Sequence, residues 1–238
     1  MRKYIFDSYE EMSRAATLLF AERISRKPDI VLGLATGSTP LGLYKGLAAL
    51  YEAGELDFSR VVSYNLDEYY PIPREDEQSY YYFMHENLFS KVNINPGNTH
   101  LPDGQAADPE AACAEYELEL REAGIDLQLL GVGGNGHIGF NEPGACLLRD
   151  THITALTEDT IKANARFFAS AEDVPRSALT MGMGSIMSAK SIIVLVSGAN
   201  KAQAFSSMFS GRIDPMCPAT FLQLHPDVIV LADRDAAT

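Results

Sequence analysis

Apolar residues recur along the chain in two alternating patterns, short continuous runs and longer stretches with a helical period. Continuous runs are typical of strands buried on both faces, and they occupy residues 29–34, 60–66, 125–132, 191–197 and 227–232. Helical stretches separate them at residues 8–25, 41–52, 79–89, 109–123 and 201–209. This alternation predicts an α/β fold, a Rossmann-like three-layer sandwich in which helices flank a mostly parallel sheet.

Other segments are less regular. Residues 91–108 hold two prolines, two glycines and several asparagines, so they are predicted to form an irregular connection. Residues 152–156 and 178–183 show no clear period. Residues 157–168 have a helical pattern with a basic and aromatic end and are a candidate mobile lid. Because the chain has no internal repeat, low-complexity tract or linker, residues 1–238 are predicted to form a single domain.

A glycine-rich loop at residues 131–144 follows the apolar run 127–130. Six of its residues are glycine, which lets the backbone adopt positive φ and approach a ligand closely. Ligands of open α/β sheets bind at the carboxyl ends of the strands, where this loop is expected to lie. His137 and Glu142 could meet if the loop folds back. The alternative is a turn-rich connection with a histidine satisfied in the core, because glycine motifs often match by chance.

A polar turn at residues 35–40 lies between a predicted strand and a predicted helix. The N–H groups at a helix N-terminus are unpaired and carry the positive end of the helix dipole, so they favour anions. Thr36, Ser38 and Thr39 add hydroxyl donors around Gly37. The turn lacks the Walker ending and the Gly-x-Gly-x-x-Gly dinucleotide pattern. It therefore indicates an anion site or, alternatively, a capped turn without a ligand.

Charged residues follow two other predicted strands. Asp67 and Glu68 come directly after the run 60–66, and because neighbouring strand residues face opposite ways, at most one is expected in a cleft. A carboxylate there could act as a general base, although a helix cap or solvated loop is the commoner role. Lys201 follows the run 191–197 and could bind a phosphate, or it is an ordinary solvated lysine.

Composition restricts the classes of partner. The 238 residues carry a formal charge of −13 without clustered Lys and Arg, which argues against a general nucleic-acid or anionic-membrane surface. The N-terminus is charged and no segment is apolar enough to span a bilayer, so we expect neither a signal peptide nor membrane insertion. The three cysteines form no Cys-x-x-Cys pair, which indicates reduced thiols in a cytoplasmic protein and no zinc site.

In order and spacing, these motifs resemble those of the glucosamine-6-phosphate deaminase family. The resemblance covers nearly the whole chain and is carried by residues 35–40, 65–69, 131–144, 164–168, 178–184, 201–202 and 222–226. It implies conversion of glucosamine 6-phosphate to fructose 6-phosphate and ammonia, by aldose–ketose isomerisation coupled to loss of the amine. It also implies that the partner is a small sugar phosphate and that no metal or organic cofactor is needed.

The same resemblance implies roles for individual residues. Asp67 matches the base that moves a proton between C2 and C1. His137 matches the residue that opens the pyranose ring, with Glu142 as its carboxylate partner. The remaining matches form the phosphate site: Thr36, Gly37, Ser38 and Thr39 in the turn, with Arg166 and Lys201 as its cationic clamp.

Two departures from the family pattern carry expectations of their own. Asn135 stands where many members have aspartate, so it adds no negative charge and His137 is expected to be less strongly held as imidazolium. Members activated by N-acetylglucosamine 6-phosphate carry a basic pair where this chain has His152 and Thr154, and the chain ends at Thr238 without a long extension. We therefore expect a non-allosteric enzyme that is a monomer or a homo-oligomer.

Two alternative functions follow from the same motifs. A 6-phosphogluconolactonase-type hydrolase resembles this family in fold and also has a Gly-His loop, but residues 67–69 and 140–143 favour the deaminase. A non-catalytic sugar-phosphate sensor would keep the phosphate site and lose the base or the His–Glu pair. Since Asp67, His137 and Glu142 are all present, the sensor is the weaker alternative.

Overall fold

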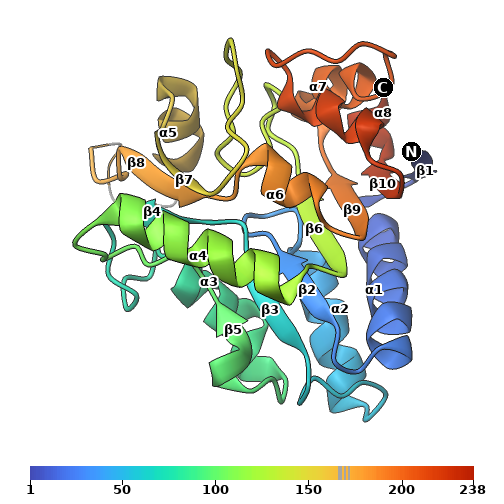
Figure 1. Cartoon of the computed structure of the whole chain (residues 1–238). Coiled ribbons are helices and arrows are strands. Elements are labelled where there is room, and N and C mark those ends of the chain that lie inside the picture. The colour runs from blue at the N-terminus through green and yellow to red at the C-terminus, as the bar shows by residue number, and fades with distance from the viewer. Residues whose placement is uncertain (166–167, 169, 171) are drawn as a thin grey trace.

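A seven-stranded parallel sheet forms the centre of the computed structural model, which describes residues 1–165, 168, 170 and 172–238 (Figure 1). Its strands lie in the order β1-β10-β9-β6-β2-β3-β5. Their bounds are Arg2–Phe6 (β1), Val228–Asp233 (β10), Ser191–Val196 (β9), Leu127–Gly131 (β6), Val31–Leu34 (β2), Val62–Asn65 (β3) and Thr99–His100 (β5). All six neighbouring pairs are parallel, which confirms the predicted α/β fold.

Helices flank this sheet. Their bounds are Tyr9–Arg26 (α1), Leu41–Glu52 (α2), Tyr80–Asn87 (α3), Pro109–Ala123 (α4), Glu158–Asn164 (α5), Met183–Met187 (α6), Ala202–Ser207 (α7) and Arg234–Ala237 (α8). The predicted bounds of α2 and α4 are confirmed, and α4 begins at the cap Asp108, which accepts hydrogen bonds from two backbone N–H groups. In Figure 1, α4 crosses the face of the sheet nearest the viewer. Within the described residues, no helix has the length and apolar character needed to cross a membrane.

A second, three-stranded antiparallel sheet lies beside the main one, and the sequence did not predict it. The strands β4 (Asp67–Tyr70), β8 (Ser177–Thr180) and β7 (His152–Ala155) follow in that order. The helix cap or solvated loop considered for Asp67 was therefore wrong, because the chain enters a new strand at this residue. An apolar cluster that includes Tyr69, Phe140 and Ala178 packs around this sheet.

Two edge strands of the main sheet were also missed. Four of the five residues of β1 are exposed, so the strand lacks the buried apolar run by which the others were recognised. The two residues of β5 lie within the segment 91–108, which was predicted to be irregular throughout. Both strands depend on pairing with a single neighbour, β10 for β1 and β3 for β5.

Candidate active site

Four segments with polar side chains meet at one edge of the main sheet. The strands β3, β2, β6 and β9 are consecutive and parallel, so the segments that follow their carboxyl ends lie at the same edge. The turn 35–40 follows β2, and Asp67 follows β3. The loop 131–144 begins at the end of β6, and Lys201 follows β9. The structure therefore brings together site residues that the sequence places far apart.

Asp67 is a buried carboxyl group at the start of β4, with 6% of the residue exposed. It pairs across the sheet with Thr180, and the loop approaches both side chains at Gly139. A Cβ atom at Gly139 would lie 3.3 Å from Asp67 Oδ2 and 2.9 Å from Thr180 Oγ1. Burial, and then the charge of Glu68, raises the pKa of Asp67 to about 8, and no donor among the described residues offsets this rise. Such a carboxyl group can take up and return a proton near neutral pH.

Glu68, the neighbouring acid, points away from Asp67 as strand alternation requires. Its carboxylate accepts hydrogen bonds from the backbone N–H groups of Tyr80 at 2.8 Å and Tyr81 at 2.9 Å, at the start of α3. Burial raises the pKa of Glu68 to about 7, while these donors and the N–H of Tyr69 act in the opposite direction. Glu68 therefore fastens α3 to β4, and Asp67 is left as the acid of the site.

The loop after β6 folds back on itself and fixes the position of His137. Gly133 N donates to His137 O at 2.9 Å, and His137 N donates to Asn135 Oδ1 at 3.1 Å. The imidazole ring packs directly on the backbone of Gly133, where a Cβ atom would lie only 2.4 Å from ring atoms. Any larger residue at position 133 would displace the ring, which explains one glycine of the motif.

Glu142 lies beside His137, as the sequence predicted they could. Their Nδ1 and Oε1 atoms are 3.2 Å apart, although this buried contact lacks the alignment of a hydrogen bond. Asn135 Nδ2 donates to the other carboxylate oxygen, Oε2, at 2.8 Å, and the hydroxyl of Thr160 donates to Oε1. Burial alone would raise the pKa of Glu142, but His137, Thr160 and Asn135 together lower it. Glu142 is therefore an anion at neutral pH.

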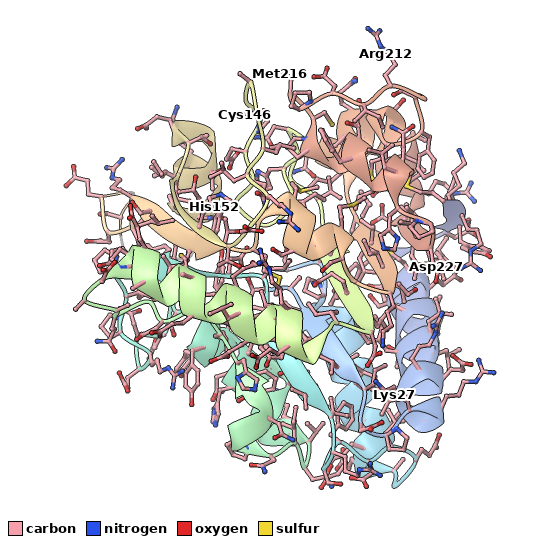
Figure 2. All side chains as sticks on the ribbon, viewed as in Figure 1. Lys27, Cys146, His152, Arg212, Met216 and Asp227 are labelled. Carbon is pink, nitrogen blue, oxygen red and sulfur yellow. The ribbon has the colours of Figure 1, made fainter. Side chains whose placement is uncertain are left out.

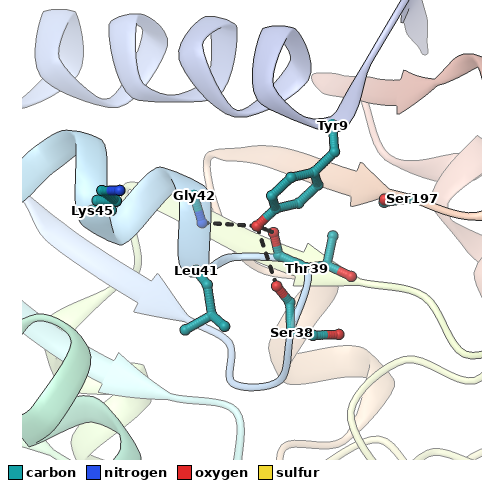
Figure 3. A pocket seen from close by; sticks show the side chains of 7 residues that line it. All are labelled: Tyr9, Ser38, Thr39, Leu41, Gly42, Lys45 and Ser197. Atoms are coloured by element: carbon teal, nitrogen blue, oxygen red, sulfur yellow. Dashed lines mark hydrogen bonds between the residues drawn. The ribbon is translucent and has the colours of Figure 1, made fainter.

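The predicted anion turn is held from outside by Tyr9 of α1. The Tyr9 hydroxyl donates to the carbonyl oxygens of Ser38 and Thr39, at 3.2 and 3.0 Å, and accepts from Gly42 N at 2.8 Å (Figure 3). A cavity of about 480 Å³ adjoins the turn and is lined by Tyr9, Ser38, Thr39, Leu41, Gly42, Lys45 and Ser197. The turn is thus fixed by contacts within the protein before any ligand binds.

The predicted cationic clamp is described only in part. Lys201 ends a 3-10 turn, Ala199–Lys201. Gly134 of the loop 131–144 packs against this turn at the carbonyl oxygen of Asn200. Asp233 fixes the approach to the turn by accepting hydrogen bonds from Ser197 Oγ at 2.5 Å and from Gly198 N. Arg166 lies outside the described residues, as do residues 167, 169 and 171.

Sequence reasoning missed three residues that shape the site: Tyr9, Thr160 and Asp233. Only Thr160 had a recognisable signal, because Thr157 caps α5 by accepting from Thr160 N and so marks a helix start. The contacts of Tyr9 and Asp233 join segments about 30 or more residues apart, which no local pattern reveals. Among the described residues, no group of three or more His, Cys, Asp or Glu side chains could hold a metal ion.

Two exposed segments meet beyond the end of the loop 131–144. Gly144 N donates to Pro215 O at 3.3 Å and joins the end of the His137 loop to the segment before Pro218. Figure 2 shows Cys146 and Met216 on these segments, at the end of the molecule farthest from Lys27. Cys146 is exposed, and all three cysteines are free thiols.

Comparison with known proteins gives consistent matches. Residues 7–230 match the family model described as glucosamine-6-phosphate isomerases/6-phosphogluconolactonase. The glucosamine-6-phosphate deaminase of Halothermothrix orenii is 54% identical over 239 residues, which cover 100% of this chain and 99% of that protein. A glucosamine-6-phosphate deaminase of Clostridium perfringens is 55% identical over 238 residues, with 100% and 98% covered.

Solved structures separate into a near and a distant group. A monomeric glucosamine-6-phosphate deaminase superimposes with a TM-score of 0.97 at 44% identity, covering 100% of this chain and 99% of that one. The 6-phosphogluconolactonase of Trypanosoma brucei superimposes with a TM-score of 0.80 at 22% identity, covering 99% and 97%. The second likeness concerns the fold alone.

Proposed function

This chain belongs to the family of glucosamine-6-phosphate isomerases and 6-phosphogluconolactonases, and we infer that it is a glucosamine-6-phosphate deaminase. The reaction converts glucosamine 6-phosphate and water to fructose 6-phosphate and ammonia. One observation of the site supports the catalytic roles proposed below for individual residues. A buried carboxyl group with a pKa near neutrality, Asp67, faces the same loop that holds the His137–Glu142 pair. Isomerisation of an amino-aldose phosphate needs both a proton carrier and a ring-opening group.

The 6-phosphate is proposed to bind at the turn formed by Thr36, Gly37, Ser38 and Thr39. This turn precedes α2, where hydroxyl groups and backbone N–H groups at a helix start favour an anion. Lys201 and Arg166 are proposed to complete the site as cations. Local donors of this kind would let a chain with a formal charge of −13 hold an anionic substrate.

Ring opening is assigned to His137. The imidazole would take the proton from the 1-hydroxyl group of the pyranose. It would then return a proton to the ring oxygen as the bond between C1 and the ring oxygen breaks, which leaves the open-chain aldehyde. Glu142 faces Nδ1 and would stabilise the imidazolium that forms between these two transfers. The nitrogen that reaches substrate is therefore Nε2.

Isomerisation is assigned to Asp67. Its carboxylate would remove the proton from C2 of the open chain, giving an enol-amine, and return it to C1, giving the 2-imine of fructose 6-phosphate. Water then adds to the imine carbon, and the nitrogen leaves as ammonia when the C2–N bond breaks. A carboxyl group with a pKa of about 8 can both accept and donate the proton within this sequence.

Two features of the assembly and its regulation are also proposed. We expect the chain to act as a monomer, because the similar deaminase structure is that of a monomeric enzyme. We also expect no activation by N-acetylglucosamine 6-phosphate, since His152 and Thr154 replace a basic pair and the His152 ring already contacts Asp150 O at 2.9 Å. Saturation curves should be hyperbolic and unchanged by that sugar phosphate; sigmoidal curves that it abolishes would contradict the proposal.

The activity itself is tested by incubating purified protein with glucosamine 6-phosphate. The expected result is ammonia and fructose 6-phosphate in equal amounts. Unphosphorylated glucosamine should react far more slowly, because it lacks the anchoring phosphate. Hydrolysis of 6-phosphogluconolactone without ammonia release from the amino sugar would instead establish the alternative lactonase function.

A further inference from the structure

One carboxylate oxygen of Glu142 contacts side chains from two different elements. Its Oε1 atom accepts the hydroxyl hydrogen of Thr160 from α5 and lies 3.2 Å from His137 Nδ1 on its own loop. Its Oε2 atom is occupied by Asn135 Nδ2 at 2.8 Å. The direction of the carboxylate is therefore set by Thr160 and Asn135, while His137 contacts it from the side.

The two contacts at Oε1 differ in alignment. Nδ1 of His137 is buried without an aligned hydrogen bond. The Thr160 hydroxyl, in contrast, belongs to a chain, because Thr157 Oγ1 donates to Thr160 Oγ1 at 3.1 Å and Thr160 Oγ1 donates to Glu142. Consecutive hydroxyl bonds polarise one another towards the final acceptor. Thr160 is only 5% exposed, so water has little access to compete for its hydroxyl.

We propose that Thr160 is a positioning residue, whose hydroxyl holds Glu142 Oε1 out of alignment with His137 and so keeps the imidazole available as a base. The proposal rests on the deaminase function, because it concerns the residue assigned to ring opening. With Oε1 already neutralised in part by Thr160, the carboxylate stabilises imidazolium less than an unshared one would. A neutral imidazole is the form that can take the proton of the sugar 1-hydroxyl group.

The other charged or titratable groups around the loop are independent of Thr160. Asp67 approaches at Gly139, Cys217 packs against Gly136, and the turn ending at Lys201 packs against Gly134. On α5 itself, Glu158 pairs with Arg176 at 3.7 Å, and Lys162 is exposed. Among the described residues, Glu142 is the acid recorded in an ion-pair contact with His137. Removing the Thr160 hydroxyl therefore changes one donor at Oε1 and leaves these groups in place.

The test is the titration of His137 in unliganded protein after Thr160→Val, which removes the hydroxyl at nearly constant volume. Loss of one hydrogen bond to the carboxylate should raise the pKa of His137 by about half to one pH unit. The imidazole resonances are followed by NMR, and His137→Gln assigns the correct one among five histidines. The KM for glucosamine 6-phosphate should change less than roughly threefold.

Three variants separate this role from support of α5. Thr160→Ser keeps the hydroxyl and should titrate like the unmodified protein. Glu158→Gln alters the same helix without contacting Glu142 and should leave the titration unchanged. Thr160→Ala should shift the pKa of His137 in the same direction as Thr160→Val. The two variants serve as alternatives, so the test can still be made if one of them folds poorly.

An unchanged or lowered His137 pKa in the variants without a hydroxyl would overturn the proposal. An equal shift in Thr160→Ser would overturn it as well, because the hydroxyl would then not be the cause. The NMR titration needs no turnover. Absence of ammonia release would contradict the deaminase function, while the titration alone decides the role of Thr160.

Discussion

Asp67 and Glu142 are two carboxyl groups of one site with sharply different surroundings, since Asp67 is buried and faces the loop 131–144, whereas Glu142 lies on that loop and is partly buried. Burial acts in the same direction on both, since it penalises the charged form. Glu142 receives two hydrogen bonds and lies beside His137, so its pKa is lowered. Asp67 has no such donor among the described residues, and its pKa rises to about 8. The two carboxyl groups therefore differ both in burial and in hydrogen-bond donors, and together these differences decide which of them holds a proton.

This difference matches the two roles that the proposed reaction requires. A group that carries a proton from C2 to C1 must gain and lose it near the working pH, and Asp67 is tuned in this way. A group that orients an imidazole and stabilises its cation must remain charged, and Glu142 is tuned in that way. Pairs of titratable groups whose surroundings drive their pKa values apart commonly mark such a division of roles.

The largest expected effect comes from removing the proton carrier. Asp67→Asn should lower kcat by about 100- to 10,000-fold, the usual contribution of general base catalysis, with little change in phosphate binding. The measurement is the rate of ammonia release at saturating glucosamine 6-phosphate.

The matched control is Glu68→Gln, which changes the adjacent buried acid that fastens α3. It should lower the stability of the protein but keep kcat within roughly tenfold of the unmodified enzyme. Near-normal turnover by Asp67→Asn would show that the base is another group.

A smaller effect is expected from neutralising the charged partner. Glu142→Gln preserves the shape of the side chain but removes the negative charge facing His137 Nδ1. We expect kcat/KM to fall by about 10- to 100-fold and the pKa of His137 to fall, because imidazolium loses its counter-charge. The kcat/KM profile across pH measures both changes. A pH profile that matches the unmodified enzyme would mean that Glu142 does not control the imidazole.

The raised pKa of Asp67 also predicts how stability depends on pH. The folded protein holds this proton up to about pH 8, whereas the unfolded chain releases it near pH 3.8. The stability contribution is therefore complete below the unfolded value and is lost as the pH rises through the folded one. Between pH 6 and 9 the unmodified protein should lose about 2 kcal/mol more unfolding free energy than Asp67→Asn. Urea unfolding at both pH values tests this, and parallel losses in the two proteins would contradict it.

The smallest expected effect comes from placing an aspartate at position 135. Asn135 Oδ1 accepts from His137 N, so its Nδ2 must face Glu142. Asn135→Asp would bring two carboxylate groups within hydrogen-bond distance, which favours a shared proton or a more strongly held imidazolium. The part of the pH–rate profile that depends on His137 should move to higher pH by about one pH unit. An unchanged profile would show that the charge at position 135 has no influence on His137.

Sequence patterns predicted the central part of this fold and, with it, the sheet edge at which the candidate site residues meet. Buried parallel strands form continuous apolar runs, and capped helices such as α4 carry their own start and stop residues. The second sheet escaped prediction because β4, β7 and β8 carry no continuous apolar run, the pattern by which the buried parallel strands were recognised. Thr160 escaped because its role depends on a contact with Glu142, 18 positions earlier, that only the folded chain creates.

The division of roles between Asp67 and Glu142 is tested most directly by a titration of the two carboxyl groups themselves. Carboxyl carbons are labelled with ¹³C, followed by NMR across pH, and assigned with Asp67→Asn and Glu142→Gln. Asp67 is expected to titrate near pH 8, and Glu142 is expected to titrate below the ordinary glutamate range. If Asp67 instead titrated near pH 4, like an ordinary aspartate, the pKa values of the two carboxyl groups would not differ as described and the division of roles would be wrong.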